Sequence, residues 1–178
     1  MYSQIINFWF EEIDSAMWWK KDDGFDALLV ERFADVHARA CCCELFDWRV
    51  EPLGRLAEIM VLDQFSRNMF RDSAQAFAHD ALSLVLAQQA VAVGADQSLS
   101  PVQRSFLYMP FMHSESLLIH EVAVELFRAN GIENNLEFEF KHKRIIEEVG
   151  RYPHRNELLG RESTAEEIEF LTKPGSSF

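Results

Sequence analysis

Apolar side chains spaced three and four residues apart run through most of this chain, and that spacing restricts the fold more than any other feature. It is clearest in one stretch of the N-terminal half and one of the C-terminal half. The apolar positions are Phe25, Leu28, Leu29, Phe33, Val36 and Ala40, then Ile119, Val122, Ala123, Leu126 and Phe127. Each set forms a stripe along one face of an α-helix. Because no long run of strictly alternating apolar and polar residues lies between hairpin turns, the pattern predicts an all-α protein.

Capping signals place one helix between Asp72 and Val93. Asp72 and Gln75 have the spacing of a capping box, and Gly94 is suited to end a helix. No Lys or Arg occurs from Asp72 to Gln103, and apolar residues lie nearly all around this helix. We therefore expect it to be central and covered on most sides.

Further helix signals follow in the second half of the chain. Ser100 is a suitable N-cap and Pro101 a suitable first helical residue, while Pro110 should end or kink the helix that begins there. Acid-before-base pairs and a second capping box indicate two later helices, through Glu137 with Lys141, Glu139 with Lys143, and Ser163 with Glu166. Helices joined by short turns predict a single domain over residues 1–178, which is a stack of about seven to nine antiparallel helices.

The charge of the chain argues against polyanionic partners. Seventeen Lys and Arg residues oppose 29 Asp and Glu residues, which leaves a net charge of -12. The resulting field repels phosphate backbones and anionic lipids, so we expect neither nucleic acid nor membrane as a partner. The N-terminal apolar run has no Lys or Arg before it, unlike a secretory signal, and no apolar run is suited to span a membrane. A cytoplasmic protein is expected.

The three cysteines are adjacent in the sequence, at Cys41, Cys42 and Cys43. Adjacent side chains on a helix point to different faces, so these residues cannot join distant segments through disulfides. We interpret them as small buried apolar residues in a reducing compartment. Metal-binding spacings, a Gly-rich phosphate loop and a nucleophile elbow are all missing from the sequence. We therefore expect no metal and no cofactor.

Polar side chains gather in three clusters outside the apolar stripes. The first lies in the LDQFSRN segment at 62–68, the second spans residues 104–115 where two helices meet, and the third is the RYPHRN loop at 151–156. Of the 17 cations in the chain, 12 are Arg, whose planar fork suits carboxylate and phosphate groups. The candidate ligand-binding residues are Gln64, Arg67, Asn68, Arg104, Tyr108, His113, Glu115, His154, Arg155 and Asn156.

These motifs resemble those of a known family. The marks of the resemblance are LDQFSRN, FAHD at 77–80, Arg104 with YMP at 108–110, HSE at 113–115, and RYPHRN with the following LGRxST. Over nearly its whole length the chain is similar to a widespread family of uncharacterised bacterial proteins, the domain of unknown function numbered nine-two-four. The resemblance implies a tetratricopeptide-like, all-helical fold and no assigned activity.

The chain departs from the pattern of this family in a few places. Ser66 stands where Pro is usual, Glu148 where Arg is frequent, and His120 near a usual Gln, and the cysteine run is particular to this chain. An acid at Glu148 reduces the positive charge just before the third cluster, which weakens the case for an anion site there.

Two classes of function fit the three clusters. A helical binding module, which we favour, would hold a carboxylate- or phosphate-bearing peptide or small molecule through Arg, Asn and His side chains. An enzyme on a small anionic substrate would hold the anion with Arg and move a proton with His113, Glu115 or His154. In a third interpretation the clusters are structural braces, as an ion pair between Asp63 and Arg67 would be.

Two further groups of residues have structural interpretations. His142 shares a helix face with Phe138 and other apolar residues, so we interpret it as a core histidine hydrogen-bonded to a neighbour. Trp9, Trp18 and Trp19 precede the first long stripe and predict core or lid packing. If this region is exposed, a homo-oligomer is the alternative.

Overall fold

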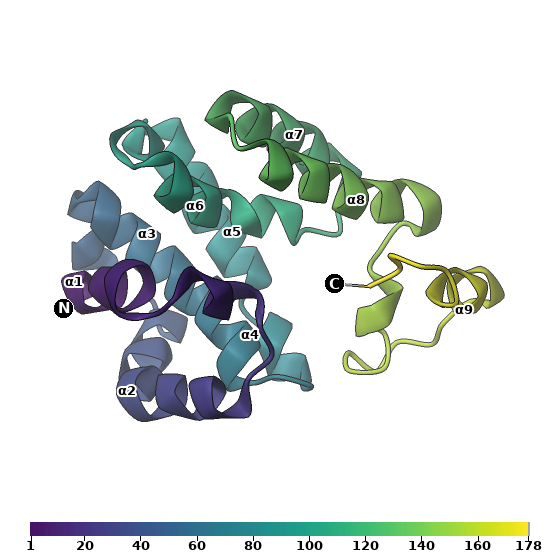
Figure 1. Ribbon diagram of the computed structural model, residues 1–178, viewed down its shortest axis with the longest axis horizontal. Helices are drawn as coiled ribbons and strands as arrows, with labels where there is room; N and C mark the ends of the chain where they lie inside the picture. Colours follow the sequence, from purple (N-terminus) through teal and green to yellow (C-terminus); the bar gives the residue numbers. More distant parts are fainter. Residues whose placement is uncertain (178) are drawn as a thin grey trace.

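The computed structural model describes residues 1–177, in which short turns join α-helices and no β-strand occurs (Figure 1). The α-helices are α1 (Tyr2–Asn7), α2 (Asp23–Cys41), α3 (Pro52–Met60), α4 (Ser66–Met69), α5 (Asp80–Ala92), α6 (Pro101–Met112), α7 (Leu117–Asn130), α8 (Glu133–Val149) and α9 (Ala165–Leu171). The all-α prediction and the expected number of helices are confirmed. None of the helices within the described residues is long and apolar enough to cross a membrane.

A continuous helical rod carries the first polar cluster. α3 passes through a π-helical turn at Val61–Phe65 directly into α4. Such a turn holds an extra residue and is frequent at functional sites, because it changes the direction in which side chains leave the helix. All five residues of the turn are buried, including Asp63 and Gln64. The apolar spacing and capping signals did not predict this turn.

Several of the predicted helix ends are confirmed. Ser100 and Gln103 form a reciprocal capping box at the start of α6. Gly94, with φ of 72°, follows the last turn of α5 in the left-handed conformation that favours glycine. Pro110 lies inside α6, which ends two residues later at Met112, so the expected break falls close to the proline.

Two predicted helix starts are wrong. Asp72 has φ of 58°, whereas an N-cap residue needs extended backbone, and α5 begins only at Asp80. The start of α9 lies one residue later than expected, because its capping box uses Thr164 and Glu167. The hydroxyl of Ser163 is engaged elsewhere, as it accepts a hydrogen bond from Asn156 at 3.0 Å.

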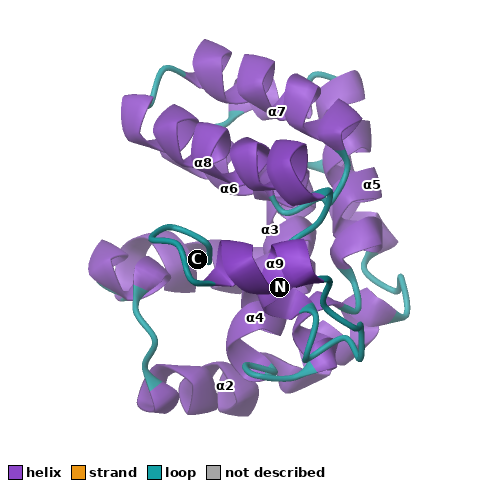
Figure 2. Ribbon diagram, turned by 90° about the vertical axis from the view of Figure 1, so that its right-hand side faces the viewer, coloured by secondary structure: helices purple, strands orange, loops and turns teal. Residues whose placement is uncertain are grey.

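The helices α3, α5, α6, α7 and α8 pack in chain order, each against the next, and α2 covers α4 and the π turn (Figures 1 and 2). The centre of the core is aromatic. The Trp9 ring is fully buried, with its centroid 5.5 Å from Phe65 and 5.8 Å from Phe106. Trp18 covers Phe106 at 5.0 Å, whereas Trp19 is largely exposed. Trp9 is thus a core residue and Trp18 a lid.

Two expectations about burial are corrected by the structure. In α5 the buried residues Ser83, Leu86, Ala87 and Ala90 occupy one face, while Val85 is 58% exposed. The helix is therefore covered on one side rather than most sides. Similarly, α2 ends at Cys41, so Cys42 and Cys43 lie in the following turn and are exposed, which contradicts their interpretation as buried residues.

The chain after α8 leaves the stack and forms what we call the C-terminal segment, residues 150–177. It contains a 3-10 turn at Pro153–Arg155 and α9, and Figure 1 shows it beside the end of α8. Its own apolar contacts are few. Tyr152 and Phe170 form a small buried cluster with Ile145 and Ile146 of α8.

Candidate functional site

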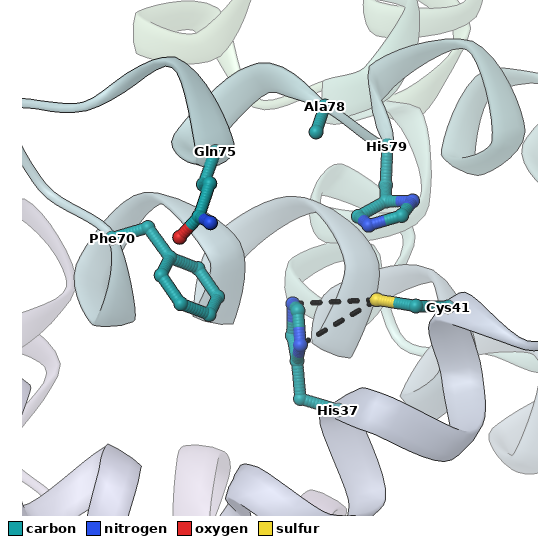
Figure 3. A pocket seen from close by; sticks show the side chains of 6 residues that line it. All are labelled: His37, Cys41, Phe70, Gln75, Ala78 and His79. Carbon is teal, nitrogen blue, oxygen red and sulfur yellow. Dashed lines mark hydrogen bonds between the residues drawn. The ribbon is translucent and has the colours of Figure 1, made fainter.

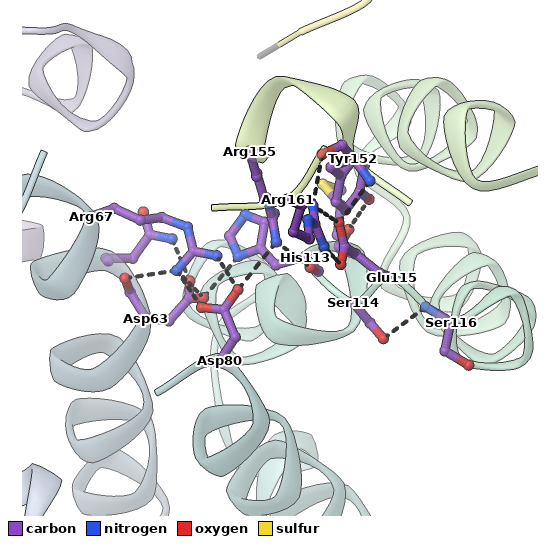
Figure 4. A network of polar contacts seen from close by, with 12 residues as sticks. Asp63, Arg67, Asp80, His113, Ser114, Glu115, Ser116, Tyr152, Arg155 and Arg161 are labelled. Atoms are coloured by element: carbon purple, nitrogen blue, oxygen red, sulfur yellow. Dashed lines mark hydrogen bonds and ion pairs between the residues drawn. The ribbon is translucent and has the colours of Figure 1, made fainter. Parts of the chain in front are cut away.

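Residues from all three polar clusters meet in one network, which we call the central network (Figure 4). Its members are Asp63, Arg67, Asp80, His113 and Arg155. They come from the π turn, from α4, from the first residue of α5, from the end of α6 and from the C-terminal segment. The fold therefore joins helices of the stack to the loop that follows it.

Asp63 is the most deeply buried member, with only 1% of its side chain exposed. One carboxylate oxygen accepts a hydrogen bond from His113 Nδ1 at 2.7 Å and lies 3.0 Å from Arg67. The other oxygen accepts a hydrogen bond from the side-chain amide of Gln64 at 2.6 Å. Burial alone would raise the pKa of this carboxyl, but Arg67 and His113 outweigh it and hold the pKa far below its usual range. Asp63 is thus an ionised anchor, and its predicted pairing with Arg67 is confirmed.

A second carboxylate is shared by two guanidinium groups. Arg67 donates two parallel hydrogen bonds of 3.0 Å to the two oxygens of Asp80. Arg155 donates to one of these oxygens at 3.3 Å and to the backbone carbonyl of His113 at 3.1 Å. Asp80 is more exposed than Asp63, at 22% of its side chain.

The guanidinium of Arg155 lies over two aromatic rings. Its guanidinium carbon is 4.7 Å from the ring centre of Phe77 and 4.4 Å from that of Tyr152. Its Nε atom is buried and has no hydrogen-bond partner among the described residues. Burial, with repulsion from Arg67, lowers the pKa of Arg155 from its usual value. Arg155 is therefore a stacked and incompletely neutralised cation.

His113 can act as a neutral base in this network. Burial and the nearby Arg67 lower its pKa despite the opposing carboxylate of Asp63, so the ring is neutral at pH 7. Because Nδ1–H donates to the Asp63 carboxylate, the proton of the neutral ring lies on Nδ1 and Nε2 carries a lone pair. An ionised carboxylate behind an oriented imidazole is an arrangement suited to general-base chemistry.

Glu115 belongs to an adjoining set of contacts that fixes the C-terminal segment. Its carboxylate accepts two hydrogen bonds from Arg161, at 2.7 and 2.9 Å, and one from the backbone of Tyr152 at 2.7 Å. Burial would raise the pKa of Glu115, but these donors keep it below the usual value. The Tyr152 hydroxyl donates to the Met112 carbonyl at 2.6 Å.

Arg104 and Tyr108 are not brought to the central network. Arg104 donates to the backbone carbonyls of Asp96 and Leu99, each at 3.1 Å. The buried Tyr108 hydroxyl donates to the Asp96 carboxylate at 2.6 Å. These contacts tie α6 to the turn before it. The second cluster thus divides into a structural part near its start and a site part at His113.

The remaining candidates lie beside the central network or within the C-terminal segment. Gln64 contacts Asp63 directly, and Asn68 donates to the Gln64 carbonyl at 2.9 Å. Asn156 is buried and donates to Ser163 and to Glu167, at 3.0 and 3.2 Å, which organises the C-terminal segment. His154 is partly buried, its Nδ1 has no partner among residues 1–177, and burial lowers its pKa to about 4.

Sequence reasoning left out Asp80, Tyr152 and Arg161 as site residues. Each lies inside a motif that carried the family resemblance, which was the available signal. The interpretation of His142 as a core residue is confirmed, since it is buried and its Nδ1–H donates to the Phe138 carbonyl at 2.8 Å.

A metal centre finds no support in the described part of the chain. Within residues 1–177, no group of three or more His, Cys, Asp or Glu residues is placed to hold a metal ion.

This arrangement defines an all-helical protein with a buried network of carboxylate, imidazole and guanidinium groups where its C-terminal segment meets the helical stack. The chain belongs to the family described as bacterial protein of unknown function (DUF924), which matches residues 5–175. It is similar to a solved structure of a protein of unknown function from Agrobacterium tumefaciens. That protein is 37% identical, with a TM-score of 0.90 and 96% of each chain covered. No curated protein matches the chain.

Proposed function

We propose that this protein is a binding module that holds the carboxylate or phosphate of a small molecule or peptide at Arg155. The observation that supports this best is the state of the Arg155 guanidinium. It is 6% exposed, shares its carboxylate partner with Arg67, and has a buried Nε donor without an acceptor among the described residues. A buried donor without a partner costs about 1–3 kcal/mol, which a ligand that supplies an acceptor would recover.

The stacking of Arg155 also favours a binding role. A guanidinium held against the rings of Phe77 and Tyr152 has lost much of its conformational freedom before any ligand arrives. Binding of a planar carboxylate or a phosphate then costs less entropy than it would at a flexible side chain.

Asp80 is the group that a ligand would replace. Its carboxylate sits between the two guanidinium groups as a bound carboxylate would, and it is the more exposed of the two acids in the network. Displacement of Asp80 leaves Arg67 paired with Asp63 and frees Arg155 for an anion. The proposed ligand class is thus one with an acidic group that competes with an aspartate.

The test is a thermal-shift titration with inorganic phosphate and with citrate. We expect both anions to raise the Tm of the wild type, and to raise that of Asp80→Asn further because the internal competitor is weakened. Arg155→Gln should abolish the shift. Arg104→Gln is the matched control, since Arg104 is bound to backbone carbonyls elsewhere, and it should respond like the wild type.

The result distinguishes binding from bracing. If the central network is only a structural brace, Asp80→Asn and Arg155→Gln lower the Tm, and neither variant changes the response to anions. That outcome would reject the proposed function.

A second candidate is an enzyme that acts on the same anionic ligand, and the pairing of Asp63 with His113 favours it. The neutral imidazole, oriented by an ionised acid, could take a proton from a substrate held at Arg155. His113→Gln separates the two candidates. It should leave anion binding intact in both cases but abolish turnover only if the protein is an enzyme.

A further inference from the structure

The formal charges of the central network cancel, and this balance limits what a ligand can bring. The positive charges are those of Arg67 and Arg155, and the negative charges are those of Asp63 and Asp80. Both oxygens of each carboxylate accept hydrogen bonds, so neither acid has an oxygen left to carry a proton. The two acids are therefore ionised, and they neutralise the two guanidinium groups.

Displacement of Asp80 toward solvent changes this balance by one charge. Arg67 and Arg155 then face Asp63 alone, which leaves one net positive charge for the incoming group to neutralise. A second negative charge on that group would have no cationic partner in the network. It would also lie close to Asp63, because Oδ1 of Asp63 and Oδ1 of Asp80 are each 3.0 Å from the same Arg67 nitrogen. Like charges this close repel strongly where little water screens them, so the site suits a singly charged group.

The titratable groups beside the network do not supply a further positive charge at neutral pH. Burial lowers the pKa of His113. The ring of His142 in α8 lies 6.5 Å from that of His113, and burial lowers its pKa to about 3. From the C-terminal segment, the Tyr152 hydroxyl stays neutral because burial raises its pKa. Glu115 and Arg161 neutralise each other through two hydrogen bonds. A doubly charged ligand therefore finds no compensating cation among these groups.

The contacts of Asp80 also show the shape that the site accepts. Arg67 donates two parallel hydrogen bonds of 3.0 Å, one to each oxygen, and Arg155 donates to one of these oxygens at 3.3 Å. Parallel bonds from one guanidinium match the planar pair of oxygens in a carboxylate. A carboxylate ligand repeats all three contacts with the same charge as Asp80, whereas a phosphomonoester adds a third oxygen and a second charge.

Asp80 has room to yield, because the chain before it borders a surface hollow of about 360 Å³ (Figure 3). Ala78 and His79 line this hollow, and the other lining residues are His37, Cys41, Phe70 and Gln75. An open space leaves no packed side chains on that side, so a small shift at the start of α5 breaks few apolar contacts. Lys and Arg are not among the lining residues, so the hollow offers an anion no lasting counter-charge of its own.

We propose that the ligand held at Arg155 is a carboxylate, and that the site excludes the doubly charged phosphate of a phosphomonoester. This inference rests on the proposed function, because it concerns the same site and narrows the ligand to one class. Citrate fits through a single one of its carboxylates, and inorganic phosphate fits through its singly charged form. Asp80 acts as the internal copy of the ligand, and the charge of Asp63 sets the limit of one negative charge.

The experiment compares acetate with methyl phosphate in thermal-shift titrations of the wild type at pH 6 and pH 8. Acetate carries one charge at both values, because a carboxyl group has a pKa of about 4. Methyl phosphate loses its second proton with a pKa of about 6, so its singly charged fraction falls roughly fiftyfold between pH 6 and pH 8. We expect its apparent affinity to fall by the same factor, whereas that of acetate should stay within about twofold. Arg155→Gln, titrated in parallel, defines the response that belongs to this site.

The outcomes separate this inference from the proposed function. If methyl phosphate binds as tightly at pH 8 as at pH 6, the site accepts a dianion and the inference is overturned, while anion binding at Arg155 stands. If neither anion gives a response that Arg155→Gln removes, the proposed function itself is rejected. The acetate titration at each pH accounts for changes in the protein, because acetate keeps its charge.

Two substitutions test whether Asp63 sets the charge limit. Asp63→Asn removes the remaining negative charge, so the affinity for methyl phosphate should fall by less than about fivefold between pH 6 and pH 8. Asp26→Asn is the matched control, since it removes an equal charge from an acid that pairs with Arg71 at 2.6 Å outside the network. It should keep the fall of roughly fiftyfold seen in the wild type. An unchanged fall in folded Asp63→Asn, or the same change in both variants, overturns the role of Asp63, and the wild-type comparison stands whether or not Asp63→Asn folds.

Discussion

The helical stack and the C-terminal segment are held in place by different forces. In the stack, buried aromatic and aliphatic side chains such as Trp9 and Phe65 pack against one another. The C-terminal segment is attached to the stack through ion pairs, of Arg155 with Asp80 and of Arg161 with Glu115, and through the Tyr152 hydroxyl. Apolar packing sets overall stability, whereas directional polar contacts set where the segment docks. A local opening of this segment would carry Arg155 and Tyr152 away from Asp80 without unfolding the stack.

The largest expected effect comes from breaking the aromatic core of the stack. Phe65→Ala removes a fully buried ring that contacts Trp9 and Phe33, and should lower the free energy of unfolding by about 3–5 kcal/mol. Denaturant unfolding followed by circular dichroism measures the loss. Phe46→Ala is the control, because Phe46 is 61% exposed and its removal should change stability by less than about 0.5 kcal/mol. Equal losses in both variants would contradict the assignment of the core.

A smaller and more local effect is expected at the contact between segment and stack. Arg161→Ala removes the guanidinium that donates two hydrogen bonds to the partly buried Glu115. The free energy of unfolding should fall by about 1.5–3 kcal/mol. Hydrogen exchange should show faster opening of residues 150–177 while α3, α5 and α6 keep their protection. If α3 and the C-terminal segment lose protection together, the two regions are not separable as described.

Lowering the pH should loosen the C-terminal segment through His154. Burial lowers the pKa of this residue from 6.5 to about 4, so the unfolded segment binds a proton more readily than the folded one. The stabilisation of the folded segment by the neutral ring is at its full value above pH 6.5 and declines as the pH falls toward about 4. Exchange rates of the segment, corrected for intrinsic pH dependence, should rise over this window. His154→Gln should reduce the rise, and an identical pH response in this variant would exclude His154 as its origin.

The smallest effect is expected at the exposed ion pair between α8 and the turn that follows α9. Lys173 and Glu148 lie 2.9 Å apart, but both side chains are substantially solvent-exposed. Lys173→Ala should therefore change the free energy of unfolding by about 0–1 kcal/mol, and added salt should remove the difference. A loss of stability as large as that of Arg161→Ala would show that solvent exposure does not determine how much each polar contact of this segment contributes to stability.

The helices themselves could be predicted from local signals. Apolar stripes and the capping box at Ser100 depend on residues close together in sequence, and these predictions hold in the structure. Asp72 and Ser163 failed as caps because each residue has another role, in a left-handed turn and in a hydrogen bond from Asn156 respectively. The π turn at Val61–Phe65 depends on how the rod packs against its neighbours, which no local pattern carries.

The central network was harder to predict, because its parts are far apart in the chain. Sequence indicated the segments around Gln64, His113 and His154 but could not show that they meet. Arg104 illustrates what helix geometry alone can decide. It precedes His113 by nine residues on one helix, and at 1.5 Å per residue the two lie roughly 14 Å apart, too far to share a small ligand.

The most direct test of anion binding follows the Arg155 Nε–H group itself by ¹H–¹⁵N NMR of the arginine side chains during titration with inorganic phosphate. The Arg155 resonance is assigned by its absence in Arg155→Gln, and that of Arg104 in the same way. We expect phosphate to shift the Arg155 Nε–H signal and to slow its exchange with water, while the Arg104 signal is unaffected. Unchanged Arg155 signals, or equal changes at Arg104, would contradict the proposal that Arg155 is a ligand-binding cation.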